Sequence, residues 1–159
     1  MLKLALALVT AVSEAAFTGG MRLLAKENPN IAVQIFNVDP VVIHNGANKE
    51  AIRNQVELAV RRCGFTITPD AKAGMYVSVG GHSQGSRGYY GHVNVGVLLG
   101  AQVGGDDAAI HVFDSGAMFS GPPGTAGKQL RELLAQLLDE FCNDYLRSRD
   151  EVWGKAGRP

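Results

Sequence analysis

The chain has 159 residues, a length typical of one domain with a substantial core. Hydrophobic residues make up 46% of the chain and charged residues 19%, a balance that excludes an intrinsically disordered protein. Fifteen basic residues offset fifteen acidic ones, so the formal net charge is zero at pH 7. This excludes the strongly basic balance typical of nucleic-acid and anionic-lipid binding, and it provides little electrostatic repulsion against self-association.

The first fifteen residues have the composition of a secretory signal. Lys3 lies close to the free amine, a mainly apolar run follows over residues 4–12, and small residues precede an expected cleavage after Ala15. The run is too short to span a bilayer as a helix. The alternative is an N-terminal core helix, because Leu, Ala and Met favour helical structure. We expect a signal peptide over residues 1–15, a linker or helix over 16–30, and a periplasmic or secreted protein, with a cytoplasmic one as the alternative.

A strand and an amphipathic helix are expected next. Residues 31–38 place apolar side chains at alternate positions, which is the pattern of a half-buried strand, and Asp39-Pro40 is expected to end or bend it. The segment NKEAIRNQVELAVRRCG has helical periodicity. Asn48 is suited to cap its start, and Gly64 stands where a left-handed residue ends many helices.

Four further apolar runs predict strands over residues 65–68, 74–80, 91–100 and 108–114. The last three fit one antiparallel register, because a slip by one residue would move every apolar side chain to the solvent face. The predicted partners are Met75 with Val97, Val77 with Val95, Val79 with Val93, Val97 with Val112, and Leu99 with Ile110.

The segment KQLRELLAQLLDEFCNDYLRSRD predicts a long final helix with a wide apolar stripe, which must pack on the sheet. The stripe contains Leu130, Leu133, Leu134, Leu137, Leu138, Phe141, Tyr145 and Leu146. The sequence therefore predicts an α+β two-layer sandwich, in which a mainly antiparallel sheet of four to five strands carries two helices on one face. We expect a single domain over residues 31–148 and a flexible tail over residues 149–159.

The segment GPPGTAGKQL resembles the phosphate-binding loop of AAA-type ATPases. Such a loop needs four residues between its glycines and a Ser or Thr after its Lys. Five residues separate Gly121 from Gly127, and Lys128 is followed by Gln129. We therefore expect no nucleotide and no other cofactor, and we interpret the segment as a connector in which Thr125 caps the final helix.

No catalytic residue and no metal site are expected, although an enzyme is not excluded. His92 and His111 lie on neighbouring predicted strands, but the register separates them by roughly 20 Å, at 3.3 Å per residue. Ser83 and Ser86 lie near His82 in a glycine-rich segment that gives a nucleophile no fixed geometry.

The segment GGHSQGSRGYYG, Gly80–Gly91, is the candidate binding site. It contains five glycines together with His82, Arg87, Tyr89 and Tyr90. A long loop in a compact domain is often functional, and Tyr with Gly and Ser is typical of adaptable binding loops. The alternatives are a mobile hairpin tip without a partner, and a small ligand-binding protein or enzyme that uses His82 as acid or base. We expect a protein partner, either another protein or a second copy of this chain, bound through this segment or through a sheet edge.

Two cysteines, Cys63 and Cys142, fall on the apolar faces of the two predicted helices. In an exported protein they are candidates for a disulfide. A reduced cysteine is also a common small core residue, so both interpretations stay open.

The stretch from Asn48 to Val79 combines an amphipathic helix, the strand and turn CGFTITPD, and the strand AGMYVSV. It resembles the small α/β units of bacterial envelope assembly lipoproteins, such as those of curli, of polysaccharide export and of the TolB N-terminal domain. The lipobox cysteine of those lipoproteins has no counterpart near the leader, so we expect no lipid anchor there. The resemblance implies a periplasmic, non-catalytic role in assembly or scaffolding, and it assigns no role to any residue.

Overall fold

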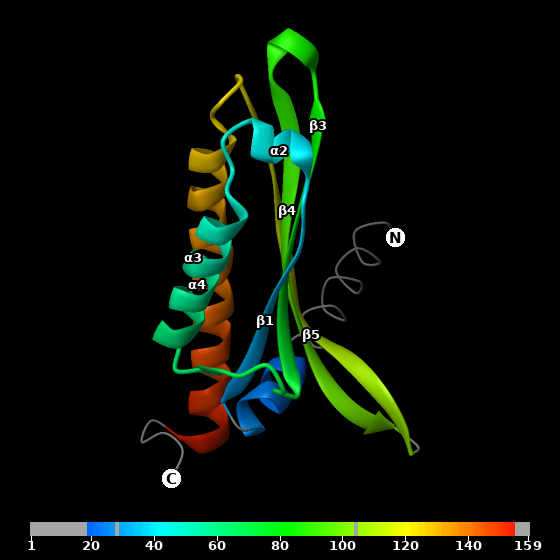
Figure 1. The fold of residues 1–159 in the computed structure, drawn as a ribbon. Helices are drawn as coiled ribbons and strands as arrows, with labels where there is room; N and C mark the ends of the chain where they lie inside the picture. Colours follow the sequence, from blue (N-terminus) through cyan, green and yellow to red (C-terminus); the bar gives the residue numbers. More distant parts are fainter. Residues whose placement is uncertain (1–18, 28, 104, 155–159) are drawn as a thin grey trace, which may run out of the picture.

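The computed structural model describes residues 19–27, 29–103 and 105–154, so the predicted leader over residues 1–15 lies outside the described residues. The described chain forms a long twisted sheet with its helices along one face, which gives the molecule two layers (Figure 1). The predicted α+β fold, with helices packed on one face of a sheet, is confirmed.

The sheet is mixed and has five strands in the order β2-β1-β3-β4-β5. The elements in chain order are β1 (Asn30–Val38), α2 (Pro40–His44), α3 (Lys49–Arg62), β2 (Thr66–Ile67), β3 (Ala73–Ser83), η1 (Gly85–Arg87), β4 (Tyr89–Val103), β5 (Asp106–Gly121) and α4 (Ala126–Trp153). Strand β1 runs parallel to β2 and β3, because α2 and α3 return the chain across the sheet. Strands β3, β4 and β5 form an antiparallel meander.

The two helices after β1 begin at capping side chains. Asn48 Oδ1 accepts a hydrogen bond from Ala51 N at 3.1 Å at the start of α3, and Gly64 ends that helix with a φ of 95°, as the sequence predicted. Helix α2 was not predicted. Asp39 accepts a hydrogen bond from Val41 N at 2.8 Å, and the proline that follows Asp39 is favourable at the first helical position, so this pair starts a short helix.

The antiparallel register agrees with the predicted one across β3 and β4. The partners Met75 with Val97, Val77 with Val95, and Val79 with Val93 are confirmed, and so is Leu99 with Ile110 between β4 and β5. All of these residues except Ile110 are buried, so alternation along each strand did specify the buried face.

A β-bulge at Val112 makes one predicted pair wrong. Val97 pairs with Phe113, because Val112 is inserted as an extra residue into β5. The exposed fractions of Val112 and Phe113 are only 0% and 5%. Val112 packs against the helical residues 19–26, whereas the Phe113 ring lies 5.3 Å from that of Phe141 in α4. The bulge thus brings two consecutive side chains into the core.

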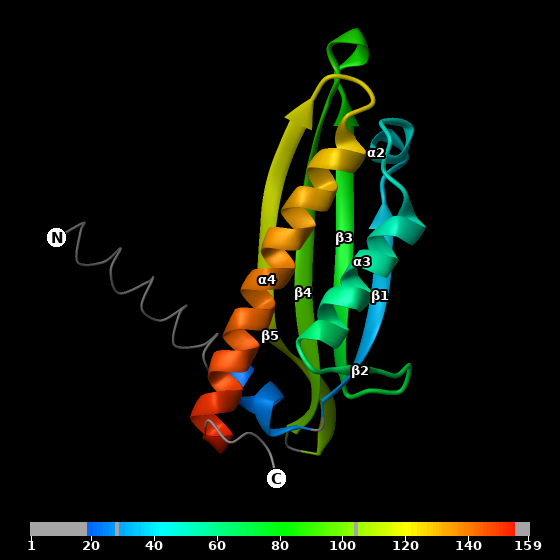
Figure 2. The same ribbon diagram turned by 90° about the vertical axis from the view of Figure 1, so that its left-hand side faces the viewer.

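Helices α3 and α4 lie side by side over one face of the sheet (Figure 2), and among the described residues no helix covers the other face. Val77, Val95 and Val97 of the covered face have exposed fractions of 0%. They pack beneath the apolar stripe of α4, of which Leu133 and Leu146 are only partly buried. The buried members of the predicted stripe are Leu130, Leu134, Leu137, Leu138, Phe141 and Tyr145.

The end of α4 extends further than the sequence indicated. Residues 149–153, assigned to a flexible tail, belong to the helix, and the rest of that tail after Gly154 lies outside the described residues. The last turns of α4 contact the helical residues 19–26. Trp153 Nε1 donates a hydrogen bond to Ala25 O at 2.9 Å, and Arg22 forms an ion pair with Glu151 at 2.8 Å.

Among the described residues, none of the helices combines the length and the apolar character that a membrane span requires.

Replacing Leu134 by Ala should lower the free energy of unfolding by about 2–5 kcal/mol, because it opens a cavity between α4 and the sheet. Urea denaturation followed by circular dichroism measures the change. Leu58→Ala is the control: its side chain in α3 is 48% exposed, so its loss should cost at most about 0.5 kcal/mol. Equal effects of the two substitutions would contradict the assigned core.

Candidate functional site

The predicted binding segment, Gly80–Gly91, is a β-hairpin rather than a long loop. Strand β3 continues to Ser83 and β4 begins at Tyr89, which leaves residues 84–88 as the connection. The glycines of this segment suggested a loop, but two of them lie within strands, where they leave space for neighbouring rings. The His92 ring occupies the place of a Cβ at Gly80, and the Phe119 ring lies against Gly91.

Tyr89 is a structural residue, which corrects its assignment to the binding site. Its side chain is 1% exposed and lies on the helix side of the sheet. The hydroxyl lies 2.9 Å from Thr125 Oγ1 and donates a hydrogen bond to Gln129 Oε1 at 2.9 Å. Tyr89 therefore anchors the start of β4, next to the hairpin connection, to the start of α4.

The GPPGTAGK connector packs against the turn between α2 and α3. Gly124 N donates to Asn45 Oδ1 at 3.2 Å, and Ala126 N donates to Asn45 O at 2.9 Å. Gly127 lies so close to the backbone of Gly46 that a Cβ has no room. Thr125 is the N-cap residue of α4, as predicted, but its hydroxyl donates to Pro122 O instead of capping the helix. These glycines and amides thus serve packing between elements.

Three of the predicted site residues remain exposed at the projecting end of the hairpin, which extends past α2 (Figure 1). His82 and Tyr90 are direct partners across β3 and β4, their ring centroids are 5.2 Å apart, and Tyr90 is 39% exposed. Arg87 lies at the tip, and His92 lies two residues from Tyr90 on the same face of the sheet. We call His82, Arg87, Tyr90 and His92 the hairpin patch.

A second group of rings crosses the uncovered sheet face nearer its middle. The Tyr76 ring lies over Gly96, 5.7 Å from the ring of Phe36 and 6.3 Å from that of His111. The pKa of the Tyr76 hydroxyl is raised above its usual value, mainly by burial and to a smaller extent by the negative charge of Asp114. Phe36 is 59% exposed, so this face offers apolar as well as polar groups.

The described residues contain no group of three or more His, Cys, Asp or Glu arranged to hold a metal.

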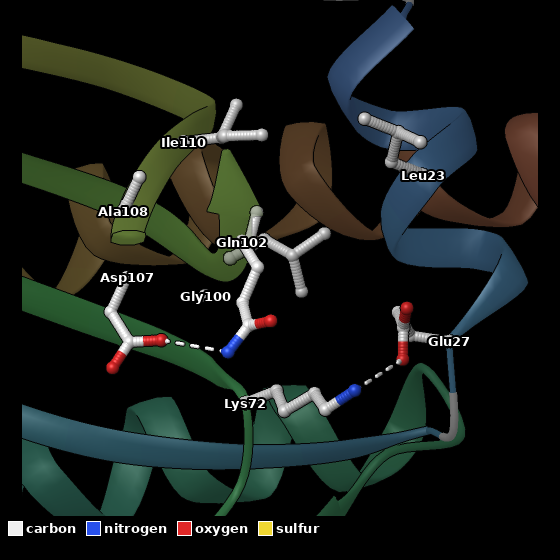
Figure 3. Close-up of a pocket in the computed structure, with 10 residues that line it drawn as sticks. Leu23, Glu27, Lys72, Gly100, Gln102, Asp107, Ala108 and Ile110 are labelled. Atoms are coloured by element: carbon white, nitrogen blue, oxygen red, sulfur yellow. Dashed lines mark hydrogen bonds and ion pairs between the residues drawn. The ribbon is translucent and has the colours of Figure 1, made fainter. Parts of the chain in front are cut away.

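A cavity of about 760 Å³ lies at the opposite end of the sheet, where β4 and β5 run beyond the start of β3 (Figure 3). Its apolar lining includes Leu23 and Ile110. At its rim Lys72 lies 3.9 Å from Glu27, and Gln102 donates a hydrogen bond to Asp107 at 3.3 Å. No local sequence pattern predicts this cavity, because segments distant along the chain form it. The lining residues are Leu23, Glu27, Lys72, Leu99, Gly100, Ala101, Gln102, Asp107, Ala108 and Ile110.

The two cysteines meet at the contact between α3 and α4. Cys63 and Cys142 have their Cα atoms 5.5 Å apart, with the sulfur atoms adjacent. This separation is within the usual range for a disulfide. A bridge would join two residues that are 79 positions apart in the sequence. It would thereby link the C-terminal end of α3 to α4.

Comparisons with known proteins assign no family to this chain. No family model and no curated protein matches it. Among solved structures it is similar to a minor lipoprotein from Acinetobacter baumannii, with 10% sequence identity, a TM-score of 0.35, and coverage of 77% of this chain and 89% of that one. It is also similar to a "putative lipoprotein from Caulobacter crescentus", with 12% identity, a TM-score of 0.38, and coverage of 82% and 93%. Likenesses at this level carry no argument about function.

Replacing Tyr89 by Phe should lower the free energy of unfolding by about 1–2 kcal/mol, because the partly buried Thr125 and Gln129 lose a hydrogen-bond partner. Hydrogen exchange should rise at the amides around Gly121, which pairs with Tyr89 across β4 and β5. Tyr90→Phe is the matched control and should change stability by less than about 0.5 kcal/mol, since that side chain is 39% exposed. A loss from Tyr90→Phe as large as that from Tyr89→Phe would refute the anchoring role.

Proposed function

We propose that this chain is an exported, non-catalytic binding protein, which contacts a protein component of the cell envelope through the hairpin patch. The observation that carries the proposal is the pair of rings of His82 and Tyr90, which stand together on the uncovered sheet face at the projecting end of the molecule. Such rings combine a large apolar area with polar edges, and they lose little conformational entropy when a partner binds.

The directions of the side chains favour a contact surface over a catalytic pocket. Tyr89 faces α4, whereas His82 and Tyr90 lie on the other face of the sheet and Arg87 lies at the tip. A catalytic or ligand-binding site needs its polar groups to converge on an enclosed space. Since Tyr89 lies on the opposite face from His82 and Tyr90, the four groups do not converge on one enclosed space. This supports the binding role over the alternative of an enzyme or a small-ligand site around Gly80–Gly91.

Two features support export. The leader-like residues 1–15 have the composition of a secretory signal. Cys63 and Cys142 have a separation suited to a disulfide, which forms and persists in oxidising compartments such as the periplasm. A bridge there would stabilise the contact between α3 and α4, typically by about 2–4 kcal/mol.

The intact mass of the protein purified from its native host tests export. We expect loss of residues 1–15 and, after reduction, a mass increase of two hydrogen atoms from opening of the Cys63–Cys142 bridge. Cys63→Ser is the control, since it should leave Cys142 open to alkylation without reductant. A full-length mass, or two thiols that react without reductant in the unsubstituted protein, would contradict the proposal.

A photoreactive amino acid in place of Tyr90 tests the hairpin patch in the native host. Irradiation should yield an adduct with another envelope protein, whereas the same group in place of Leu58, exposed on α3, should not. Adding His82→Ala should reduce the yield about fivefold or more, because truncating a central contact residue costs about 1 kcal/mol or more. Indistinguishable adducts from the two positions would exclude the hairpin patch as the contact surface.

A further inference from the structure

Strand β5 forms one edge of the sheet along its whole length. It contains 16 residues, pairs with β4 on one side and is the last strand in the sheet order (Figure 2). The opposite edge presents a shorter regular strand, because β2 has two residues and the register of β1 is irregular near its end. An edge strand presents backbone N–H and C=O groups in the geometry that another strand requires.

Only part of this edge is protected against pairing. Asp106 and Asp107 place charges at its first residues, and the bulge at Val112 interrupts the regular spacing. The following nine residues, Phe113–Gly121, contain one charged residue, no lysine and no proline. Pro122 ends the stretch. The edge therefore contains one regular segment, at whose end the backbone oxygen of Ser120 already accepts a hydrogen bond from Gln129 Nε2 at 2.9 Å.

We propose that Phe113–Gly121 pairs antiparallel with the same segment of a second copy of this chain, across a two-fold axis at Ala117, so that two sheets join into one. The backbone N–H and C=O groups of an exposed strand edge form hydrogen bonds with another extended main chain, so the partner segment must be a strand. A second copy supplies a segment of identical length, and a two-fold interface uses the same surface on both copies. The zero net charge of the chain opposes such association only weakly.

The side chains agree with an axis at Ala117. In this register Met118, which is 71% exposed, lies opposite Gly116 of the second copy, and Asp114 lies opposite Ser120. An axis at Asp114 would place two carboxylates face to face, which is unfavourable between strands. An axis at Met118 would place Asp114 opposite a proline, beyond the regular segment. An axis at Ala117 is the one that pairs Phe113 with Gly121 and so uses the whole regular segment, which makes it the favoured axis.

Cross-linking of single-cysteine additions tests the register in the purified chain, without any other protein. A short bis-maleimide reagent should join two copies of Ala117→Cys, because directly opposite residues have Cβ atoms about 4.5–5.5 Å apart. Ser120→Cys is the matched control: the two positions 120 are displaced by six residues, roughly 20 Å, and should not be joined. Equal cross-linking of both variants would overturn the two-fold pairing.

Sedimentation equilibrium tests the assembly itself. The unsubstituted chain should have twice the mass that it has in denaturant, whereas Met118→Lys should raise the dissociation constant about tenfold, because two lysines come to lie at diagonal positions roughly 7–8 Å apart. A monomeric mass at concentrations up to roughly 100 μM would overturn the proposal. Since Ala117 lies outside the hairpin patch, failure of this pairing would leave the proposed function intact, and the reverse also holds.

Discussion

The contact between the valines of the sheet and the leucines of α4 determines the rest of the structure. Val95 and Leu134 are both fully buried, on opposite sides of one continuous apolar layer. Burial of such side chains is the largest favourable term in folding a domain of this size. Because α4 contains 28 residues, it follows the sheet over most of its length and holds both ends of the molecule in place.

The same contact divides the sheet into a covered and an uncovered face. Alternation along β3 and β4 sends Val77, Val79 and Val93 under the helices, whereas Tyr76, His82 and Tyr90 occupy the other face. The exposed rings are therefore carried on a rigid support. Rigid presentation lowers the entropic cost of binding, which supports the proposed contact with another protein.

Four glycines of the described residues contribute through packing. Gly80, Gly91 and Gly96 leave room for rings from neighbouring strands, and Gly127 allows the final connector to approach the α2–α3 turn. Composition alone made both glycine-rich segments resemble loops with a ligand. The sequence does not distinguish a glycine that makes room for a ring within a strand from a glycine in a mobile loop. The neighbouring side chains in the folded protein make this distinction.

Periodicity within the sequence by itself determined the α+β class, the amphipathic helices, and most of the register, because a slip along β3 or β4 would expose every valine. It also placed Cys63 and Cys142 on the apolar faces of two helices. Only the tertiary structure decided the bulge at Val112, the inward position of Tyr89 and the extension of α4 to Trp153. Each of these depends on contacts with residues distant in the sequence, which local patterns do not encode.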